Sequence, residues 1–227
     1  MITRLLALVL FVLLAPAAHA QNAPTRQELA VYAGLHEAAA KGDVAEIERL
    51  INDGEKPNIQ DSKSRTPLHV AVYMKQHAAA RALLKLGADP NRLENDRYDV
   101  VTIAAVANDV EMLKIVLEGG ASAKNITSRY DGTALIAAAH LGHAESVKLL
   151  IEAKAPLNHV NNLGLTALLE AIVLGNGDAR HTATVRALVE AGADVNRADR
   201  QNITPLQHAR RRGYVEMARI LEGAGGQ

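Results

Sequence analysis

The side chains that could do chemistry in this chain of 227 residues are histidines and carboxylates, because cysteine is absent. Without cysteine, disulfide scaffolds, zinc–thiolate sites and thiol nucleophiles are excluded. His140 and His143, with Glu145 two residues further on, form the one cluster whose spacing could hold a metal ion on a single helical turn. No glycine-rich phosphate loop, nucleophile elbow or HExxH pattern occurs in the sequence. These observations favour a protein without catalytic residues and without a cofactor.

The charges of the chain balance, with 25 lysines and arginines against 25 aspartates and glutamates. A nucleic-acid-binding protein usually carries a basic excess, so this class is disfavoured. Hydrophobic residues make up 48% and charged residues 22% of the chain, which argues against a disordered protein. Because aromatic residues are only 3% and tryptophan is absent, the core must consist of alanine, leucine, valine and isoleucine. Such a core favours closely stacked helices.

The first twenty residues have the pattern of a bacterial secretory signal peptide. Arg4 supplies the positive charge, Leu5 to Leu14 form an apolar run of ten residues, and Pro16 follows it. Ala18-His19-Ala20 then matches the small residues of a signal-peptidase site, so we expect a signal peptide over 1–20 and cleavage between Ala20 and Gln21. The alternative, an uncleaved anchor, is disfavoured because the run is too short to span a bilayer. We therefore expect a periplasmic protein with no membrane span in its mature chain.

Three short patterns recur in phase along the rest of the chain. Thr66-Pro67-Leu68-His69 returns in part at Thr133, Thr166 and Thr204, with a degenerate copy at Asp99. The starting positions 66, 99, 133, 166 and 204 are spaced by 33, 34, 33 and 38 residues. A Gly-Ala-Asp-x-Asn pattern is clearest at 87–91 and 192–196, and a lone glycine separates helical stretches at 42, 142, 175 and 213. A repeat of this length indicates a supersecondary unit that stacks on its neighbours.

These linked patterns resemble the ankyrin repeat over roughly residues 33 to 222. The resemblance implies an all-α solenoid of about six helix–turn–helix units with β-turn or hairpin loops. We place the units at about 33–63, 64–96, 97–130, 131–163, 164–200 and 201–227, after a leader and helix extension over 21–32. The resemblance also implies that His36 and His69 tie adjacent loops together, and it puts a histidine at position 143. A metal site and an enzyme are therefore disfavoured.

Local residue chemistry supports the same elements. Thr66 can cap a helix whose first residue is Pro67, where a missing N–H costs nothing. Glycines at 54, 87 and 192 supply left-handed residues that end the second helix of a unit, and Lys154 takes that place in the fourth unit at a cost of about 1 kcal/mol. The polar Glu222 suits an outward-facing last unit. About five extra residues in the fifth unit, within 176–182, are expected to form an extended loop.

By resemblance, a partner protein would bind to the loop tips and to the exposed side of each first helix. We call these positions the predicted binding row: Lys63, Arg65, Tyr73, Met74, Asp96, Tyr98, Arg129, Tyr130, His140, Leu141, Leu163, Val173, Leu174, Arg200, Arg211 and Arg212. The row holds three of the five tyrosines, a residue type that often anchors interfaces. With Lys41 it has seven basic residues against Asp96 and the adjacent Asp131. Leu165 is expected to join its apolar centre. The charge predicts a partner with an acidic patch.

The sequence therefore predicts a monomeric, non-catalytic protein–protein interaction module of the bacterial periplasm. Two more specific roles stay open, namely an immunity or inhibitor protein and an accessory protein of a periplasmic enzyme. A different class, a small-ligand or polyanion binder that uses the basic residues, is the weaker alternative. Nucleic acid is not an expected partner.

Overall fold

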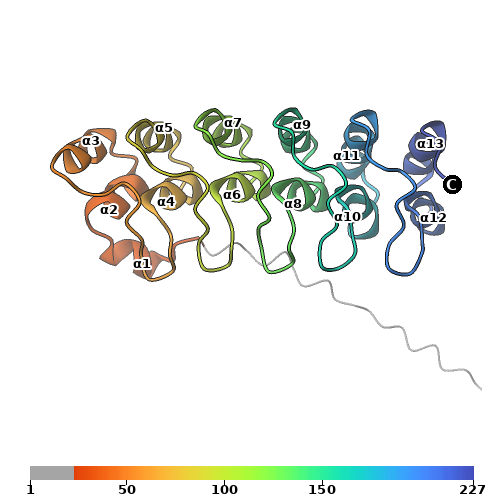
Figure 1. Ribbon diagram of the computed structural model, residues 1–227, viewed down its shortest axis with the longest axis horizontal. Coiled ribbons are helices and arrows are strands. Elements are labelled where there is room, and N and C mark those ends of the chain that lie inside the picture. Colours follow the sequence, from red (N-terminus) through yellow and green to blue (C-terminus); the bar gives the residue numbers. More distant parts are fainter. Residues whose placement is uncertain (1–22) are drawn as a thin grey trace, which may run out of the picture.

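The computed structural model describes residues 23–227, so the predicted signal peptide and the predicted cleavage site between Ala20 and Gln21 lie outside the described part. Over 23–227 the chain forms thirteen helices and no strand, apart from one isolated bridge between Thr127 and Gly132. All of these helices except α1 stand in two parallel rows, and loops project beside the inner row (Figure 1). The predicted all-α solenoid is confirmed. None of the helices described is both long and apolar enough to cross a membrane.

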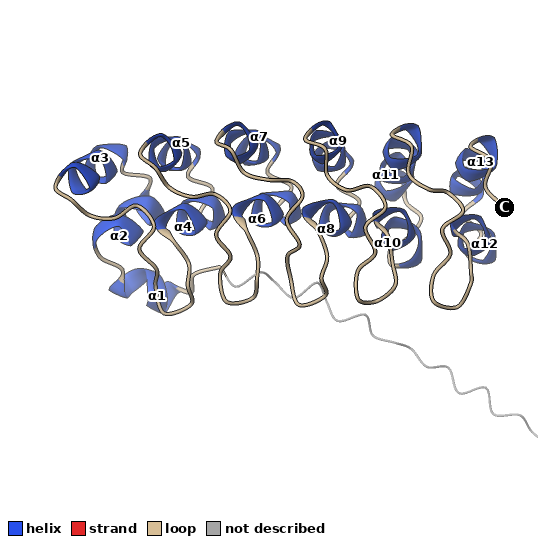
Figure 2. Ribbon diagram, in the orientation of Figure 1, coloured by secondary structure: helices blue, strands red, loops and turns tan. Residues whose placement is uncertain are grey.

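Each repeat contributes one helix to each row. The inner row consists of α2 Gly34–Lys41, α4 Pro67–Tyr73, α6 Val100–Val106, α8 Ala134–His140, α10 Ala167–Val173 and α12 Pro205–Arg211. The outer row consists of α3 Val44–Asn52, α5 His77–Lys85, α7 Val110–Glu118, α9 Ala144–Glu152, α11 Ala179–Glu190 and α13 Val215–Gly223. The loops between successive units appear as long tan fingers on one side of the array (Figure 2).

The inner helices begin where the repeat places a capping side chain. Thr66, Thr133, Thr166 and Thr204 each accept a hydrogen bond from the backbone N–H three residues further on. In the degenerate third unit the buried Asp99 does the same for α6, accepting from Thr102 N at 2.8 Å. An aspartate can therefore replace the threonine without loss of the helix start.

Alanine sets the spacing between inner helices. The residue five positions after each cap is alanine, and all five have no exposed surface: Ala71, Ala104, Ala138, Ala171 and Ala209. A helix of seven or eight residues is not stable alone, so this close packing holds the inner row together. The outer helices end as predicted on left-handed residues, including Gly87 at φ 90° and Lys154 at φ 63°.

Asparagine side chains link the turns that follow the outer helices. Asn58 Oδ1 accepts from Asp89 N at 2.8 Å, and Asn91 Oδ1 accepts from Ser122 N at 2.9 Å. The corresponding link between the third and fourth units is missing in the part of the chain that the structure describes. Lys124 stands where the asparagine would be, and Pro156 stands where its partner would be and has no N–H to donate. This junction therefore lacks both the acceptor side chain and the donor N–H of the link.

Two expectations about local structure are wrong. Residues 26–31 form a separate helix, α1 Arg26–Val31, and do not extend the first helix of the array, because Tyr32 and Ala33 are extended. The extra residues of the fifth unit do not form a long loop either. Ala179 to Thr182 make the first turn of α11, and the buried His181 anchors it by donating to the His140 carbonyl at 3.1 Å.

Candidate functional site

The loop tips form one connected surface. Asn95 N donates to the Lys63 carbonyl at 3.1 Å, Ser128 N to the Arg97 carbonyl at 3.0 Å and Asn162 N to the Tyr130 carbonyl at 2.9 Å. At the last loop a side chain makes the link, since Arg200 Nη2 donates to the Asn162 carbonyl at 2.7 Å. The hydrogen bonds hold each tip against the next and thereby position the side chains that the tips present.

A polar acceptor folds each tip. Asp61 Oδ1, five residues before the Thr66 cap, accepts from the backbone N–H groups of Lys63 and Arg65 at 2.8 and 2.9 Å. The equivalent residues of three other loops accept two backbone N–H groups in the same way: Glu94, Asn161 and Asp199. None of these four residues is among those predicted from the sequence. Their signal is an acceptor side chain at a constant five residues before each cap.

The second part of the surface lies at the carboxyl ends of the inner helices, seven and eight residues after each cap. The five inner helices from α4 onward present Tyr73 and Met74, Val106 and Ala107, His140 and Leu141, Val173 and Leu174, and Arg211 and Arg212. Because the inner helices pack side by side, these pairs form a continuous strip across the array. The strip is largely apolar in the middle and basic at its last unit.

The tyrosines of the predicted binding row are exposed to different degrees. Tyr73 and Tyr98 are half-buried against the core, and Tyr130 is 36% exposed. Burial raises the pKa of the Tyr73 and Tyr98 hydroxyls above the ordinary range. Leu163 and Leu174 are exposed by 47% and 39%. Leu165 was also expected on this surface, but it is buried because its N–H and carbonyl fold the loop around Asn161.

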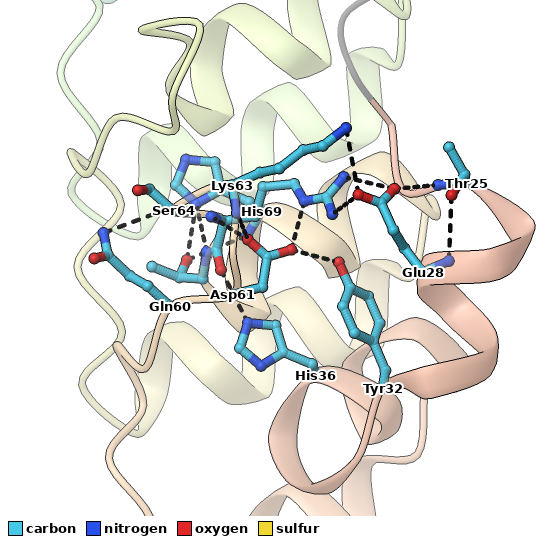
Figure 3. Close-up of polar contacts among 11 residues, drawn as sticks. Thr25, Glu28, Tyr32, His36, Gln60, Asp61, Lys63, Ser64 and His69 are labelled. Carbon is cyan, nitrogen blue, oxygen red and sulfur yellow. Dashed lines mark hydrogen bonds and ion pairs between the residues drawn. The ribbon is translucent and has the colours of Figure 1, made fainter.

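Arg65 was expected in the predicted binding row, but its side chain has no exposed surface. Its Nε lies 2.7 Å from Asp61 Oδ2, and its Nη2 lies 2.9 Å from Glu28 Oε1 on α1. Tyr32 donates to the same Asp61 oxygen at 2.7 Å (Figure 3). Arg65 therefore fastens α1 to the array and cannot contact a partner.

The carboxylate of Glu28 is held ionised in this cluster. The Thr25 backbone N–H donates to Glu28 Oε2 at 2.7 Å, and this bond, followed by those from Arg65, lowers the Glu28 pKa from 4.5 to about 2 (Figure 3). Lys63 Nζ approaches the other oxygen at 3.3 Å. Helix α1 is thus attached to the array by charged groups, since none of its own residues is buried.

Other basic residues of the surface are also paired. Lys41 pairs with Glu37, and Arg129 Nη2 lies 3.4 Å from Asp96 Oδ1. Together with Lys63 and Arg65, four of the seven expected basic residues therefore have a carboxylate partner. The seven do not form a uniformly positive row, because a carboxylate of the same helix, of α1 or of the neighbouring loop lies beside four of them.

His140 has a carboxylate partner on the next inner helix. Its Nδ1 donates to Glu170 Oε2 at 3.1 Å, and Asn161 Nδ2 donates to Glu170 Oε1 at 2.7 Å. His143 points elsewhere and donates to the Ala105 carbonyl at 3.0 Å, so the two histidines do not converge. Within residues 23–227 no group of three or more His, Asp or Glu is arranged to hold a metal ion. The contact with Glu170 therefore orients the His140 imidazole within the strip.

Two other histidines occupy the positions expected from the repeat. His36 Nε2 donates to the Arg65 carbonyl at 2.9 Å, and His69 Nε2 donates to the Arg92 carbonyl at 3.1 Å. His69 Nδ1 accepts from Thr66 N, so its ring is neutral, and burial lowers its pKa to about 4. Their predicted role in tying loops together is confirmed.

Comparison with known proteins gives the same repeat. The family model described as ankyrin repeats (3 copies) matches residues 10–94 and 101–199, and that for ankyrin repeats (many copies) matches 178–222. The ankyrin repeat protein YahD of Escherichia coli K12 is 34% identical over 83% of this chain and 94% of its own length. Human transient receptor potential cation channel subfamily A member 1 is 27% identical over 85% of this chain, which spans only 18% of the channel.

Solved structures agree with this match. An ankyrin repeat domain from Acinetobacter baumannii AYE is 44% identical, with a TM-score of 0.81, over 85% of this chain and 98% of that domain. The ankyrin repeat domain of Bcl-3, an IκB protein, is 28% identical, with a TM-score of 0.77, over 87% of this chain and 88% of that domain. The chain belongs to the ankyrin-repeat family.

Proposed function

We propose that this protein is a non-catalytic interaction module that acts in the bacterial periplasm and binds a partner protein through its loop tips and the strip of inner-helix ends. Ankyrin repeats are protein-interaction modules, and the fold is generally non-enzymatic. The periplasmic location rests on the signal-peptide pattern of residues 1–20.

One observation carries the proposal: apolar side chains stay exposed on a surface that hydrogen bonds hold in place. Tyr130 and Leu163 lie on neighbouring loop tips joined by the bond from Asn162 N to the Tyr130 carbonyl. Leu174 follows α10 in the strip, and like the other two it is more than one-third exposed. Stacking of the repeats does not need these side chains to be apolar. Aromatic and aliphatic groups on a prearranged surface are suited to the centre of an interface.

The test is capture of a periplasmic partner with three forms of the mature chain. The first is wild type, the second carries Tyr98→Ala and Leu174→Ala, and the third carries Glu48→Ala and Lys148→Ala on exposed positions of the outer row. We expect wild type and the outer-row variant to retain one protein in stoichiometric amount, and the Tyr98/Leu174 variant to lose most of it. Truncating an interface anchor costs about 2 kcal/mol, or roughly thirtyfold in affinity.

The melting temperatures of all three forms must stay close together, so that unfolding cannot be the cause of a loss of binding. Capture that depends on Glu48 and Lys148 while Tyr98 and Leu174 are dispensable would show that the assigned surface is wrong. If the captured protein is an enzyme, its activity with and without this chain separates the two specific roles. A fall in activity identifies an inhibitor, and a gain identifies an accessory protein.

A further inference from the structure

Among the seven basic residues expected on this surface, the three without a carboxylate partner within residues 23–227 lie on the last loop tip and at the end of α12. Lys63 and Arg129 are paired with Glu28 and Asp96, at 3.3 and 3.4 Å. Of the residues in the range 23–227, no carboxylate forms an ion pair with Arg200, Arg211 or Arg212. Arg211 and Arg212 are exposed. The unneutralised charge therefore belongs to one end of the array.

These arginines lie beside exposed apolar groups. Arg211 and Arg212 stand seven and eight residues after the Thr204 cap, as Val173 and Leu174 stand after the Thr166 cap. Because α10 and α12 pack against each other, the two pairs are neighbours in the strip.

The same combination occurs at the loop tips. The Arg200 side chain crosses Gly164 and donates to the Asn162 carbonyl at 2.7 Å. Leu163, which lies between Asn162 and Gly164 in the sequence, is 47% exposed. A hydrogen bond to a carbonyl oxygen leaves the charge of the Arg200 guanidinium uncompensated and leaves its other N–H groups available.

We propose that the partner presents an acidic segment to this end of the array, with carboxylates bound by Arg211 and Arg212 and an apolar side chain on Leu174. Resting on the proposed function, this inference names the chemistry of the partner. A guanidinium binds a carboxylate through two parallel hydrogen bonds, which gives direction as well as charge. Elsewhere on the surface an acidic segment would have to compete with Glu28 for Lys63, or with Asp96 for Arg129.

The two arginines also suit the carboxyl end of α12, whose dipole favours positive charge. That effect explains why a cation is stable there, but it predicts no dependence of binding on Leu174. Dependence on the arginines and on the neighbouring leucine together is therefore the property to test.

The experiment uses the mature chain and two synthetic peptides that contain Glu-Glu-Leu-Glu-Glu twice or the same sequence with glutamine in place of glutamate. Affinity is measured by calorimetry. We expect the glutamate peptide to bind about tenfold more tightly, and Arg211→Gln with Arg212→Gln to abolish that preference. The matched control, Arg81→Gln with Arg186→Gln, removes the same charge from arginines of the outer row that are paired with Glu111 and Glu216, and it should change the affinity less than twofold. Leu174→Ala should weaken both peptides.

Equal binding of the two peptides, including no binding of either at about 1 mM, would overturn the inference. An equal loss in both double variants would also overturn it, because general attraction would then suffice. Tripolyphosphate is the probe for a polyanion site. If it binds as tightly as the glutamate peptide and Leu174→Ala affects neither, the surface binds polyanions and the inference is wrong.

Failure here and failure of the proposed function have different signatures. In one outcome, a captured periplasmic protein depends on Tyr98 and Leu174 and still binds the Arg211→Gln/Arg212→Gln variant. This result would support the proposed interaction surface and contradict the inference that the partner is acidic. Loss of dependence on Tyr98 and Leu174 would remove the proposed surface itself.

Discussion

At the scale of single residues, Arg65 shows how one contact can change a side chain's role. Its loop position belongs to the predicted binding row, yet Glu28, 37 residues earlier in the chain, covers it. Its guanidinium then satisfies two carboxylates, Glu28 and Asp61. A buried charged cluster of this kind is stable only while all its members are present.

Arg65→Ala tests this dependence. The change leaves the carboxylate of Asp61, which is 8% exposed, without its cation, so we expect a loss of about 3 kcal/mol in the free energy of unfolding, measured by urea denaturation. Lys63→Ala removes a 40% exposed partner of the same Glu28 and should cost less than about 1 kcal/mol. Equal effects of the two changes would contradict the buried role of Arg65.

Attachment of α1 should depend on pH through Glu28. Its pKa is lowered from 4.5 to about 2, so its contribution to stability is fully present above pH 4.5 and is lost as the pH falls toward 2. Hydrogen exchange of the amides of α1 should therefore speed up, relative to those of α4, between pH 5 and pH 2.5. Glu28→Gln should flatten this difference. A wild-type difference that persists unchanged in the variant would assign the effect to another group.

At the scale of elements, the repeat is held together by recurring links that bridge about thirty residues. Asn91 accepts from Ser122 N and donates to the Gly120 carbonyl, as Asn58 does with Asp89 N and the Gly87 carbonyl. The junction of the third and fourth units lacks this link, since Lys124 and Pro156 replace its two partners. Stability along the array should therefore differ from one junction to the next.

Substitutions at these positions measure the link. Asn91→Ala should cost about 1 kcal/mol in the free energy of unfolding, because hydrogen bonds of exposed groups contribute that amount. Lys124→Asn alone should bring no gain, because Pro156 has no N–H. With Pro156→Ser added, the pair should become up to about 1 kcal/mol more stable than the sum of the single changes. An additive result would show that the asparagine link contributes nothing there.

At the scale of the whole molecule, the two ends of the array differ in their surface chemistry. The amino end is covered by α1 and its charged cluster, whereas the carboxyl end presents Arg211 and Arg212 beside an apolar strip. A solenoid offers a long surface to a partner, and its chemistry changes from unit to unit.

Processing of the exported chain is predicted to leave Gln21 as the first residue. Intact-mass measurement of protein released from the periplasm should match a chain of residues 21–227. Ala20→Arg should block this cleavage, because signal peptidase needs a small residue there. Periplasmic protein that keeps Met1 would refute the signal-peptide interpretation.

Sequence alone determined the repeat, the helix caps and the alanine spacing. Each of these depends on residues that lie close together within one unit, as Thr66 and Pro67 do, and on their return after about 33 residues. Tertiary structure alone decided that Arg65 is buried, that Arg129 is paired with Asp96 and that Arg211 and Arg212 have no carboxylate partner in the described range 23–227. Electrostatic pairing depends on distances between side chains of different units, and only the stacking geometry sets those distances. The repeat could therefore be predicted from its pattern, whereas the charge of its surface could not.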